Sequence, residues 1–272
     1  MTSETSLPPA RPHFNWRLLG ILLLAILVST ILVTPYALAI QNPANRGGTL
    51  PLPLQVLIPI QLIATTIIYG TFAALGLLIA RRLGLGLPLV ESWLAGRPDW
   101  SLARRFFFKA IVAGILVAVA VIALEKLLFA AQIAAELKQL KTPPGHPPVW
   151  AGFLASFYGG TTEEILLRLF ALSLFAWLLQ IVSGSTRRTP SSPVLWTANI
   201  LAAILFGLGH LPAAAALGLH IDAMLVTRAI VLNGAGGLVF GWFYFTQGLE
   251  AAMLCHFSAD IVLHVIWPLF GG

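Results

Sequence analysis

Two adjacent carboxylates and an arginine occur within six residues of an otherwise apolar segment: Glu163, Glu164 and Arg168. A charged side chain at the centre of a bilayer costs at least about 2.5 kcal/mol on insertion scales, so ionisable groups at that depth are candidates for function. On a helix, Glu164 and Arg168 lie four residues apart on one face, with the acid on the N-terminal side, which favours an ion pair. We therefore predict that Glu164 and Arg168 form a structural pair.

Glu163 has a different position on the same helix. It is rotated by about 100° from Glu164, and no basic residue lies one turn away from it in either direction. A desolvated carboxylate without a cationic partner is suited to general acid or base catalysis. Glu163 is therefore predicted to be the reactive acid.

Further polar residues occur at membrane depth in two later apolar segments. Phe206-Gly-Leu-Gly-His210 is followed by Pro212, so we expect a helix kink beside the histidine. His256-Phe-Ser-Ala-Asp260 places a histidine and an acid four residues apart, on one helix face. Polar groups within a bilayer face the interior of the helix bundle, so we expect these side chains to converge with Glu163. His264, two turns beyond His256, is a weaker candidate for the same site.

Two acids and two histidines from three helices form a set that can activate water. Glu163 is the natural general base, and His210 is placed to orient the water or to protonate a leaving group. His256 and the side chain at position 260 are placed to stabilise a developing oxyanion. The predicted reaction is hydrolysis of an amide within the membrane by Glu163, His210, His256 and Asp260, with no metal and no other cofactor.

The three motifs resemble those of a known family in order and spacing: Glu163-Glu164-x-x-x-Arg168, Phe206-x-x-x-His210 and His256-x-x-x-Asp260. That family is the CPBP intramembrane glutamic proteases, or Abi family, which include the type II CAAX prenyl proteases. The resemblance covers roughly residues 150–264. It implies an endopeptidase that acts on a membrane-associated peptide or protein, prenylated in some members.

The resemblance also implies roles for single residues. Glu163 and His210 would activate water, and His256 would donate to the oxyanion. Asp260 departs from the family, because asparagine is common at this position. An ionised aspartate accepts hydrogen bonds and does not donate them, so Asp260 is either kept neutral or orients His256.

Two alternatives use the same residues. Carboxylates and neutral imidazoles are standard zinc ligands, so one alternative is a zinc-dependent membrane protease. Intramembrane acids and histidines also form proton relays, so the other is an inactive peptide-binding or transport protein. The sequence shows no inverted repeat, which weakens the transporter hypothesis.

The elements that position these residues follow from composition. The chain has 272 residues, 58% hydrophobic and 10% charged, with a mean hydropathy of +0.89, whereas a soluble domain is about 25% charged. We predict an all-α, polytopic transmembrane bundle with its catalytic core in the C-terminal four helices. Residues 1–149 would form N-terminal transmembrane helices and surface loops, and 150–272 the catalytic bundle, within one integral membrane unit. A bilayer crossing requires about 20 apolar residues, which predicts seven to eight spans, seven of them near 17–40, 53–80, 106–131, 150–182, 194–219, 222–246 and 249–270.

Charged residues outside the motifs report on orientation and partners. The net charge is +6, but the basic residues cluster between apolar segments, which predicts the bilayer and not a nucleic acid as the partner. With the N-terminus inside, the outer connections carry three basic residues, Arg46, Lys138 and Lys141. The inner segments carry Arg11, Arg17, Arg81, Arg82, Arg97, Arg104, Arg105, Arg187 and Arg188. This asymmetry predicts a cytoplasmic N-terminus. We further expect a multi-pass protein of a prokaryotic cell membrane.

Two remaining features of the sequence lead to structural expectations. The single cysteine, Cys255, excludes an intramolecular disulfide framework. Arg228 interrupts the sixth apolar segment, and we expect it to pair with Asp222 or Glu250.

Overall fold

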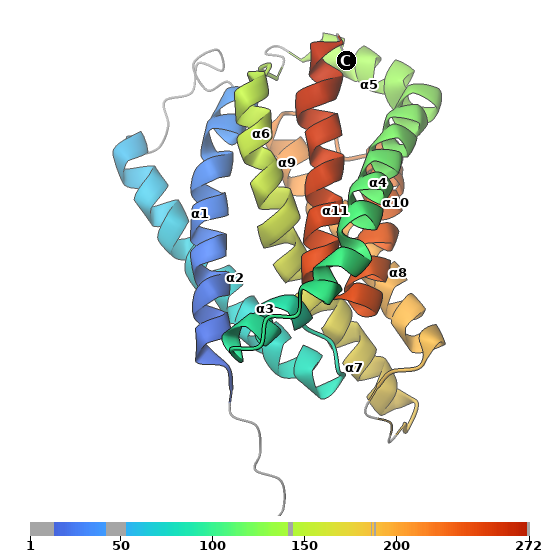
Figure 1. Cartoon of the computed structure of the whole chain (residues 1–272). Helices are drawn as coiled ribbons and strands as arrows, with labels where there is room; N and C mark the ends of the chain where they lie inside the picture. Colours follow the sequence, from blue (N-terminus) through green and yellow to red (C-terminus); the bar gives the residue numbers. More distant parts are fainter. Residues whose placement is uncertain (1–13, 42–52, 141–143, 186, 188, 271–272) are drawn as a thin grey trace, which may run out of the picture.

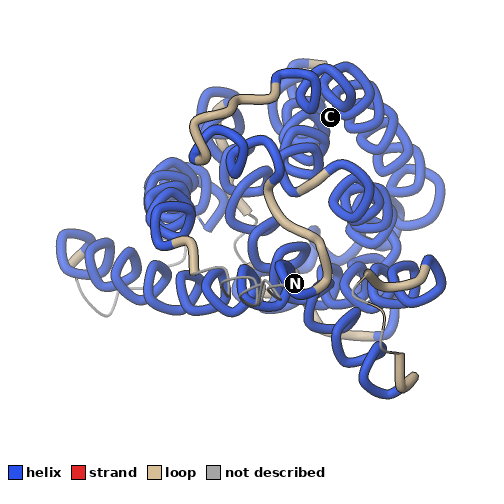
Figure 2. The backbone as a smooth tube through the Cα atoms, turned by 60° about the horizontal axis from the view of Figure 1, so that its bottom comes forward, coloured by secondary structure: helices blue, strands red, loops and turns tan. Residues whose placement is uncertain are grey.

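The computed structural model describes residues 14–41, 53–140, 144–185, 187 and 189–270. These residues form helices and connecting loops, and none of them lies in a strand (Figure 1 and Figure 2). Seven helical segments in this part of the chain are long and apolar enough to cross a membrane, which confirms the predicted all-α polytopic fold. They are Trp16–Gln41, Leu54–Arg82, Trp100–Gln139, Val149–Val182, Ser192–Ala216, Ala223–Gln247 and Leu249–Leu269.

The first three spans differ in regularity. Helices α1 (Trp16–Gln41) and α2 (Leu54–Arg82) are continuous. A short helix, α3 (Pro88–Leu94), follows at the lower end of the bundle in Figure 1. The third span combines α4 (Trp100–Leu124), the π-helical turn η1 (Glu125–Phe129) and α5 (Ala130–Gln139), and therefore extends beyond the predicted segment on both sides.

The four later spans carry the motif residues. The fourth runs through α6 (Val149–Tyr158), the π-helical segments η2 (Gly159–Glu163) and η3 (Ile165–Leu172), and α7 (Ser173–Val182). The fifth is α8 (Ser192–Gly209) and α9 (Leu211–Ala216), with the expected break at His210. The sixth is α10 (Ala223–Gln247), and the seventh is α11 (Leu249–Ile261), η4 (Val262–Ile266) and α12 (Trp267–Leu269).

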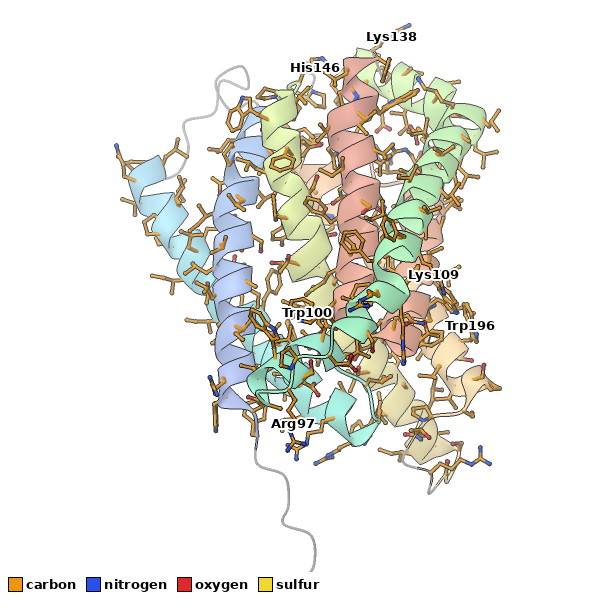
Figure 3. The ribbon with its side chains drawn as sticks, in the orientation of Figure 1. Arg97, Trp100, Lys109, Lys138, His146 and Trp196 are labelled. Atoms are coloured by element: carbon orange, nitrogen blue, oxygen red, sulfur yellow. The ribbon has the colours of Figure 1, made fainter. Side chains whose placement is uncertain are left out.

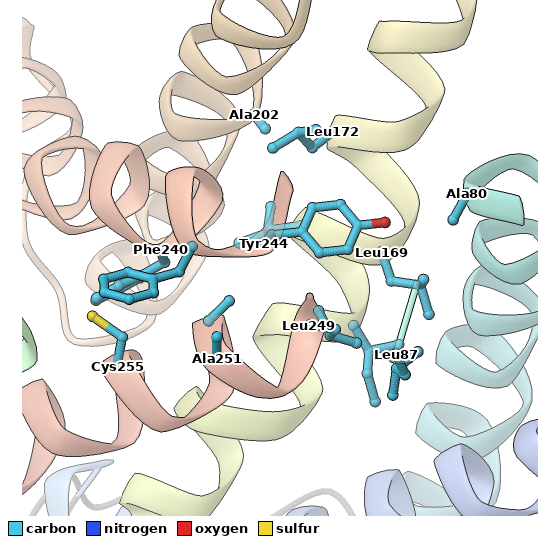
Figure 4. Packing of buried hydrophobic residues seen from close by; sticks show 14 of the residues in the cluster. Ala80, Leu87, Leu169, Leu172, Ala202, Phe240, Tyr244, Leu249, Ala251 and Cys255 are labelled. Carbon is cyan, nitrogen blue, oxygen red and sulfur yellow. The ribbon is translucent and has the colours of Figure 1, made fainter. Parts of the chain in front are cut away.

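Helix α11 lies at the centre of the bundle. It packs against α4, α6 and α10, while α10 also packs against α8 (Figure 1). In Figure 4 the Phe240 ring of α10 lies over Cys255 of α11, and the Tyr244 ring extends toward Leu169 of η3. The Tyr244 hydroxyl is 2.7 Å from the Ser173 hydroxyl. The predicted catalytic segments therefore share one buried core.

Glycine allows the close helix approaches that this core requires. A Cβ atom on Gly114 of α4 would lie 2.8 Å from the Ser258 Cβ of α11, and one on Gly207 of α8 would lie 2.5 Å from the Ile230 Cα of α10. Small residues at such contacts let transmembrane helix backbones come together. These contacts fix the helices that carry His256 and His210.

Large apolar side chains cover the outer surface of several spans. Leu24 of α1, Ile63 of α2 and Leu116 of α4 are each more than 60% exposed. Apolar side chains on a bundle surface suit contact with lipid tails, because water would leave them unfavourably hydrated. This surface supports the assignment of the chain as an integral multi-pass membrane protein.

Basic side chains mark the two ends of the bundle. Figure 3 places Arg97 at the lower end and Lys138 at the upper end. The C-terminus of α2, with Arg81 and Arg82, is also at the lower end (Figure 1). The other basic residues used to predict the orientation include four that lie outside the described residues, Arg11, Arg46, Lys141 and Arg188.

Cysteine labelling tests the predicted orientation. We expect Lys138→Cys to react with a membrane-impermeant maleimide in intact cells and Arg97→Cys to react only after permeabilisation, because both side chains are exposed at opposite ends. The native chain is the control, since its single thiol, Cys255, is buried. The reverse pattern of labelling would contradict a cytoplasmic N-terminus.

Candidate active site

Glu164 and Arg168 form the predicted ion pair at the centre of the motif residues. Glu164 Oε1 is 2.9 Å from Arg168 Nη1, and the two side chains are 0% and 1% exposed. Arg168 Nη2 donates a hydrogen bond to the Gly237 carbonyl at 3.1 Å. Its guanidinium carbon lies 5.0 Å from the ring centroid of Phe206 and 5.4 Å from that of Phe240. The pair therefore connects the fourth span to α8 and α10.

His256 is fixed by the same carboxylate. Its Nδ1 is 2.8 Å from Glu164 Oε1, and its ring stacks on Phe240 at a centroid distance of 4.4 Å. Because Glu164 is paired with Arg168, it is a carboxylate, which only accepts hydrogen bonds. His256 Nδ1 must therefore carry the hydrogen, and Nε2 is the atom that can exchange a proton.

His256 Nε2 faces two further carboxyl groups. It is 3.8 Å from Glu163 Oε2 and 3.6 Å from Asp260 Oδ1. Glu163 is 26% exposed, whereas Asp260 is buried. Two ionised carboxylates and an unprotonated nitrogen would repel one another, so this group must share at least one proton. The structure thus brings Glu163, His256 and Asp260 together around an exchangeable proton.

The π-helical turn η2 allows this approach. A Cβ atom on Gly159 would overlap Asp260 Oδ2 and lie 3.1 Å from His256 Nε2. In addition, the Thr162 and Ser29 hydroxyls are 2.6 Å apart, which ties η2 to α1. Single π-helical turns are rare and frequently occur at functional sites.

His210 occupies the break between α8 and α9. Its backbone N–H donates to Gly207 O at 3.1 Å, while its Nδ1 is 2.9 Å from Phe206 O. A carbonyl oxygen only accepts, so Nδ1 carries the hydrogen and the Nε2 of the neutral ring is free to accept a proton. One imidazole nitrogen therefore satisfies a backbone carbonyl, while the other stays available.

Phe206 links His210 to the rest of the group. Its ring centroid lies 5.0 Å from that of His210 and 5.6 Å from that of His256. In the described part of the chain, no hydrogen bond or ion pair joins His210 to Glu163 directly. Glu163, His256 and Asp260 thus lie in direct contact, as predicted. His210 is connected to them through the contacts of the Phe206 ring.

Two residues of this group had weak or no support in the sequence. His264 Nε2 is 3.8 Å from Asp260 Oδ1, and the Tyr36 hydroxyl is 3.3 Å from His264 Nδ1. The spacing of two helical turns from His256 to His264 was the signal for the histidine. Tyr36 comes from α1, far from every motif in sequence, and no pattern pointed to it.

Arg228 has a different partner from the one expected. Its Nε is 2.8 Å from Glu125 Oε2 of η1, so the expectation of Asp222 or Glu250 is wrong. Asp222 instead accepts a hydrogen bond from Leu225 N and caps α10. Glu250 accepts from Val90 N and holds α3 against α11. Both acids satisfy backbone donors, which local sequence spacing did not reveal.

Other arrangements in the structure lie apart from this site. Among the described residues, no group of three or more His, Cys, Asp or Glu side chains has the arrangement of a metal site. A cavity of ≈ 560 Å³ lies at the lower end of the bundle and is lined by Arg81, Arg105 and Tyr244, among others. It contains none of the four predicted catalytic residues.

A comparison with known families identifies the segment that carries the site. Residues 143–262 match the family model described as type II CAAX prenyl endopeptidase Rce1-like. The match confirms, over this segment, the family predicted from the three motifs, and it includes Glu163, His210, His256 and Asp260. No curated protein and no solved structure matches the chain.

Removal of one partner from the buried ion pair should strongly destabilise the folded protein. We expect Arg168→Ala to lower the free energy of unfolding by about 3–5 kcal/mol, because Glu164 would remain buried with an unpaired charge. Denaturant or thermal unfolding in detergent measures this loss. Arg228→Ala is the matched control, and its partly exposed pair should contribute about 1 kcal/mol or less. An Arg168→Ala protein as stable as the wild type would contradict the structural role.

Proposed function

We propose that this chain, with its match to the type II CAAX prenyl endopeptidases, is an intramembrane endopeptidase that hydrolyses a peptide bond with water activated by Glu163 and His210. The family match and the seven apolar helices support a protease within the membrane. One observation carries the catalytic part of the proposal. His256 is held by Glu164 through Nδ1 and faces Glu163 and Asp260 through Nε2.

Glu163 is proposed as the general base. It is the partly exposed acid of the group, whereas Glu164 is buried in its ion pair. A carboxylate at this place can take a proton from water as the water attacks the scissile carbonyl, and can return that proton to the departing amine. No covalent intermediate is required.

His210 is proposed as the second residue that binds the attacking water. Its Nδ1–H is engaged by the Phe206 carbonyl, which leaves Nε2 as an acceptor for a water proton. The helix breaks at His210. The imidazole is held there by the Phe206 carbonyl of the same span and not by another span. The water would lie between His210 and Glu163.

His256 and Asp260 are proposed to stabilise the oxyanion together. A protonated His256 presents an Nε2–H donor to the negative oxygen that forms on the scissile carbonyl. Asp260, as a carboxylate, cannot donate, but its Oδ1 at 3.6 Å stabilises the positive charge on His256. This division of roles accounts for an aspartate where the family commonly has asparagine.

The proposed substrate is a membrane-associated peptide or protein, and the family description favours one with a prenylated CAAX-type end. We further propose that residues 150–272 form the catalytic bundle and that residues 1–149 supply helices around it. The charge pattern supports a cytoplasmic N-terminus, and we propose that the membrane is that of a prokaryotic cell. The partners are then the substrate and the lipid bilayer.

Replacement of the water-activating residues should abolish cleavage without unfolding the protein. We expect Glu163→Gln and His210→Ala each to reduce the rate about 10²- to 10⁴-fold, because the first removes the general base and the second removes a group that holds the attacking water. Prenylated and unmodified membrane-tethered peptides, cleaved by purified protein in liposomes, provide the measurement. Glu136→Gln is the matched control, since Glu136 lies on α5 and contacts the backbone of His220.

The same assay separates the glutamic protease from a zinc enzyme. Activity of the wild type should persist in a strong chelator, because the proposed base and oxyanion donor are protein side chains. Metal analysis of the purified protein accompanies the assay. Stoichiometric zinc together with loss of activity in chelator would contradict the proposal.

A methyl group at the close contact between η2 and α11 should also stop catalysis. Gly159→Ala places its Cβ against Asp260 Oδ2 and His256 Nε2, so we expect about a 100-fold loss of cleavage. Gly234→Ala is the control, because its nearest neighbour, the Ala203 carbonyl oxygen, is 3.8 Å from the added Cβ. Equal activities of the two variants would show that the η2 contact does not position the site.

A further inference from the structure

Asp260 lies between two imidazoles on its own helix. Its Oδ1 is 3.6 Å from His256 Nε2 and 3.8 Å from His264 Nε2, in an i−4 and i+4 arrangement along α11 and η4. Its Oδ2 lies beside Gly159 of η2, where an added Cβ atom would overlap it. Both distances are within the range of an ion pair. The same carboxylate oxygen, Oδ1, therefore lies close to both imidazole rings.

Tyr36 orients the second imidazole. Its hydroxyl is 3.3 Å from His264 Nδ1, and the two rings meet edge to face at a centroid distance of 5.3 Å. A phenol that donates to Nδ1 leaves the hydrogen of the neutral ring on Nε2. This tautomer points the N–H dipole of a neutral ring at the Asp260 carboxylate, at a distance of 3.8 Å that is longer than a hydrogen bond.

We propose that His264, oriented by Tyr36, is a positioning residue that holds the Asp260 carboxylate toward His256 during hydrolysis. The inference rests on the proposed function, because it assigns a purpose to groups beside the predicted oxyanion donor. It also explains why aspartate fits at position 260. The negatively charged oxygen of a carboxylate attracts the N–H groups of both rings more strongly than the neutral oxygen of an asparagine would.

Several other titratable groups surround this contact. Glu163 and Glu164 interact electrostatically with Asp260 from the fourth span. His256 and His210 interact with His264, and Tyr36 interacts with Asp260. A change in pH would alter several of these groups at once. The decisive test is therefore a comparison of variants at one pH.

A double-mutant cycle separates positioning through Asp260 from a general structural effect. The four proteins are the wild type, His264→Ala, Asp260→Ala and the double variant, each assayed for kcat and KM on the peptide that the wild type cleaves. We expect His264→Ala to lower kcat about 10- to 100-fold with KM unchanged, because misplacement near the reacting atoms affects the chemical step. In the Asp260→Ala background the same change should alter kcat less than about twofold, since the side chain through which His264 acts is gone.

Three further variants complete the test. His264→Gln keeps an N–H donor and should retain most of kcat, whereas His264→Leu should behave like His264→Ala. Tyr36→Phe should lower kcat in the wild type and have no further effect in His264→Ala. His220→Ala is the matched control, because His220 lies outside the site and contacts Glu136 through its backbone N–H, which the substitution keeps.

The outcomes distinguish failure of this inference from failure of the proposed function. A wild type that is folded but cleaves no peptide would overturn the proposed function and this inference with it. An active wild type in which His264→Ala leaves kcat unchanged would overturn the inference alone. Equal losses from His264→Ala in both backgrounds would also overturn it, because the residue would then act independently of Asp260.

Discussion

The buried contact of Glu164 with Arg168 and His256 is the interaction on which the rest of the site depends. Two charges at membrane depth are tolerated only as a pair, and this pair is almost completely enclosed. The guanidinium reaches α10 through the Gly237 carbonyl and contacts Phe206 of α8, while the carboxylate holds His256 of α11. One ion pair therefore aligns four spans and selects the His256 nitrogen that faces the candidate catalytic acids.

The sequence predicted the parts of the site that follow from local spacing. Glu164 and Arg168 stand one turn apart, and so do His256 and Asp260, so their contacts could be read from helical periodicity. The seven spans followed from the length of the apolar segments. The π-helical segments, by contrast, arise from packing between spans and leave no mark in hydropathy. The Arg228 contact with Glu125 likewise depends on tertiary packing, so local spacing suggested the wrong partner.

The first span makes contacts with the site that the family match does not cover. Ser29 bonds Thr162 of η2, and Tyr36 contacts His264. Tyr36 and His264 both lie outside residues 143–262. The segment that carries the motif residues is thus supported by α1, which packs against α6 and η2 (Figure 1). The first N-terminal helix therefore packs directly against the segment that carries the motif residues.

The central claim is that water activated by Glu163 attacks the peptide directly. The most direct measurement is the composition of the product when the wild type cleaves its peptide in ¹⁸O-labelled water with hydroxylamine present. The account predicts a new carboxyl terminus that carries ¹⁸O and no hydroxamate, because the acyl group is never attached to the protein. Formation of a hydroxamate would reveal an acyl-enzyme intermediate and would contradict the role of Glu163 as a general base.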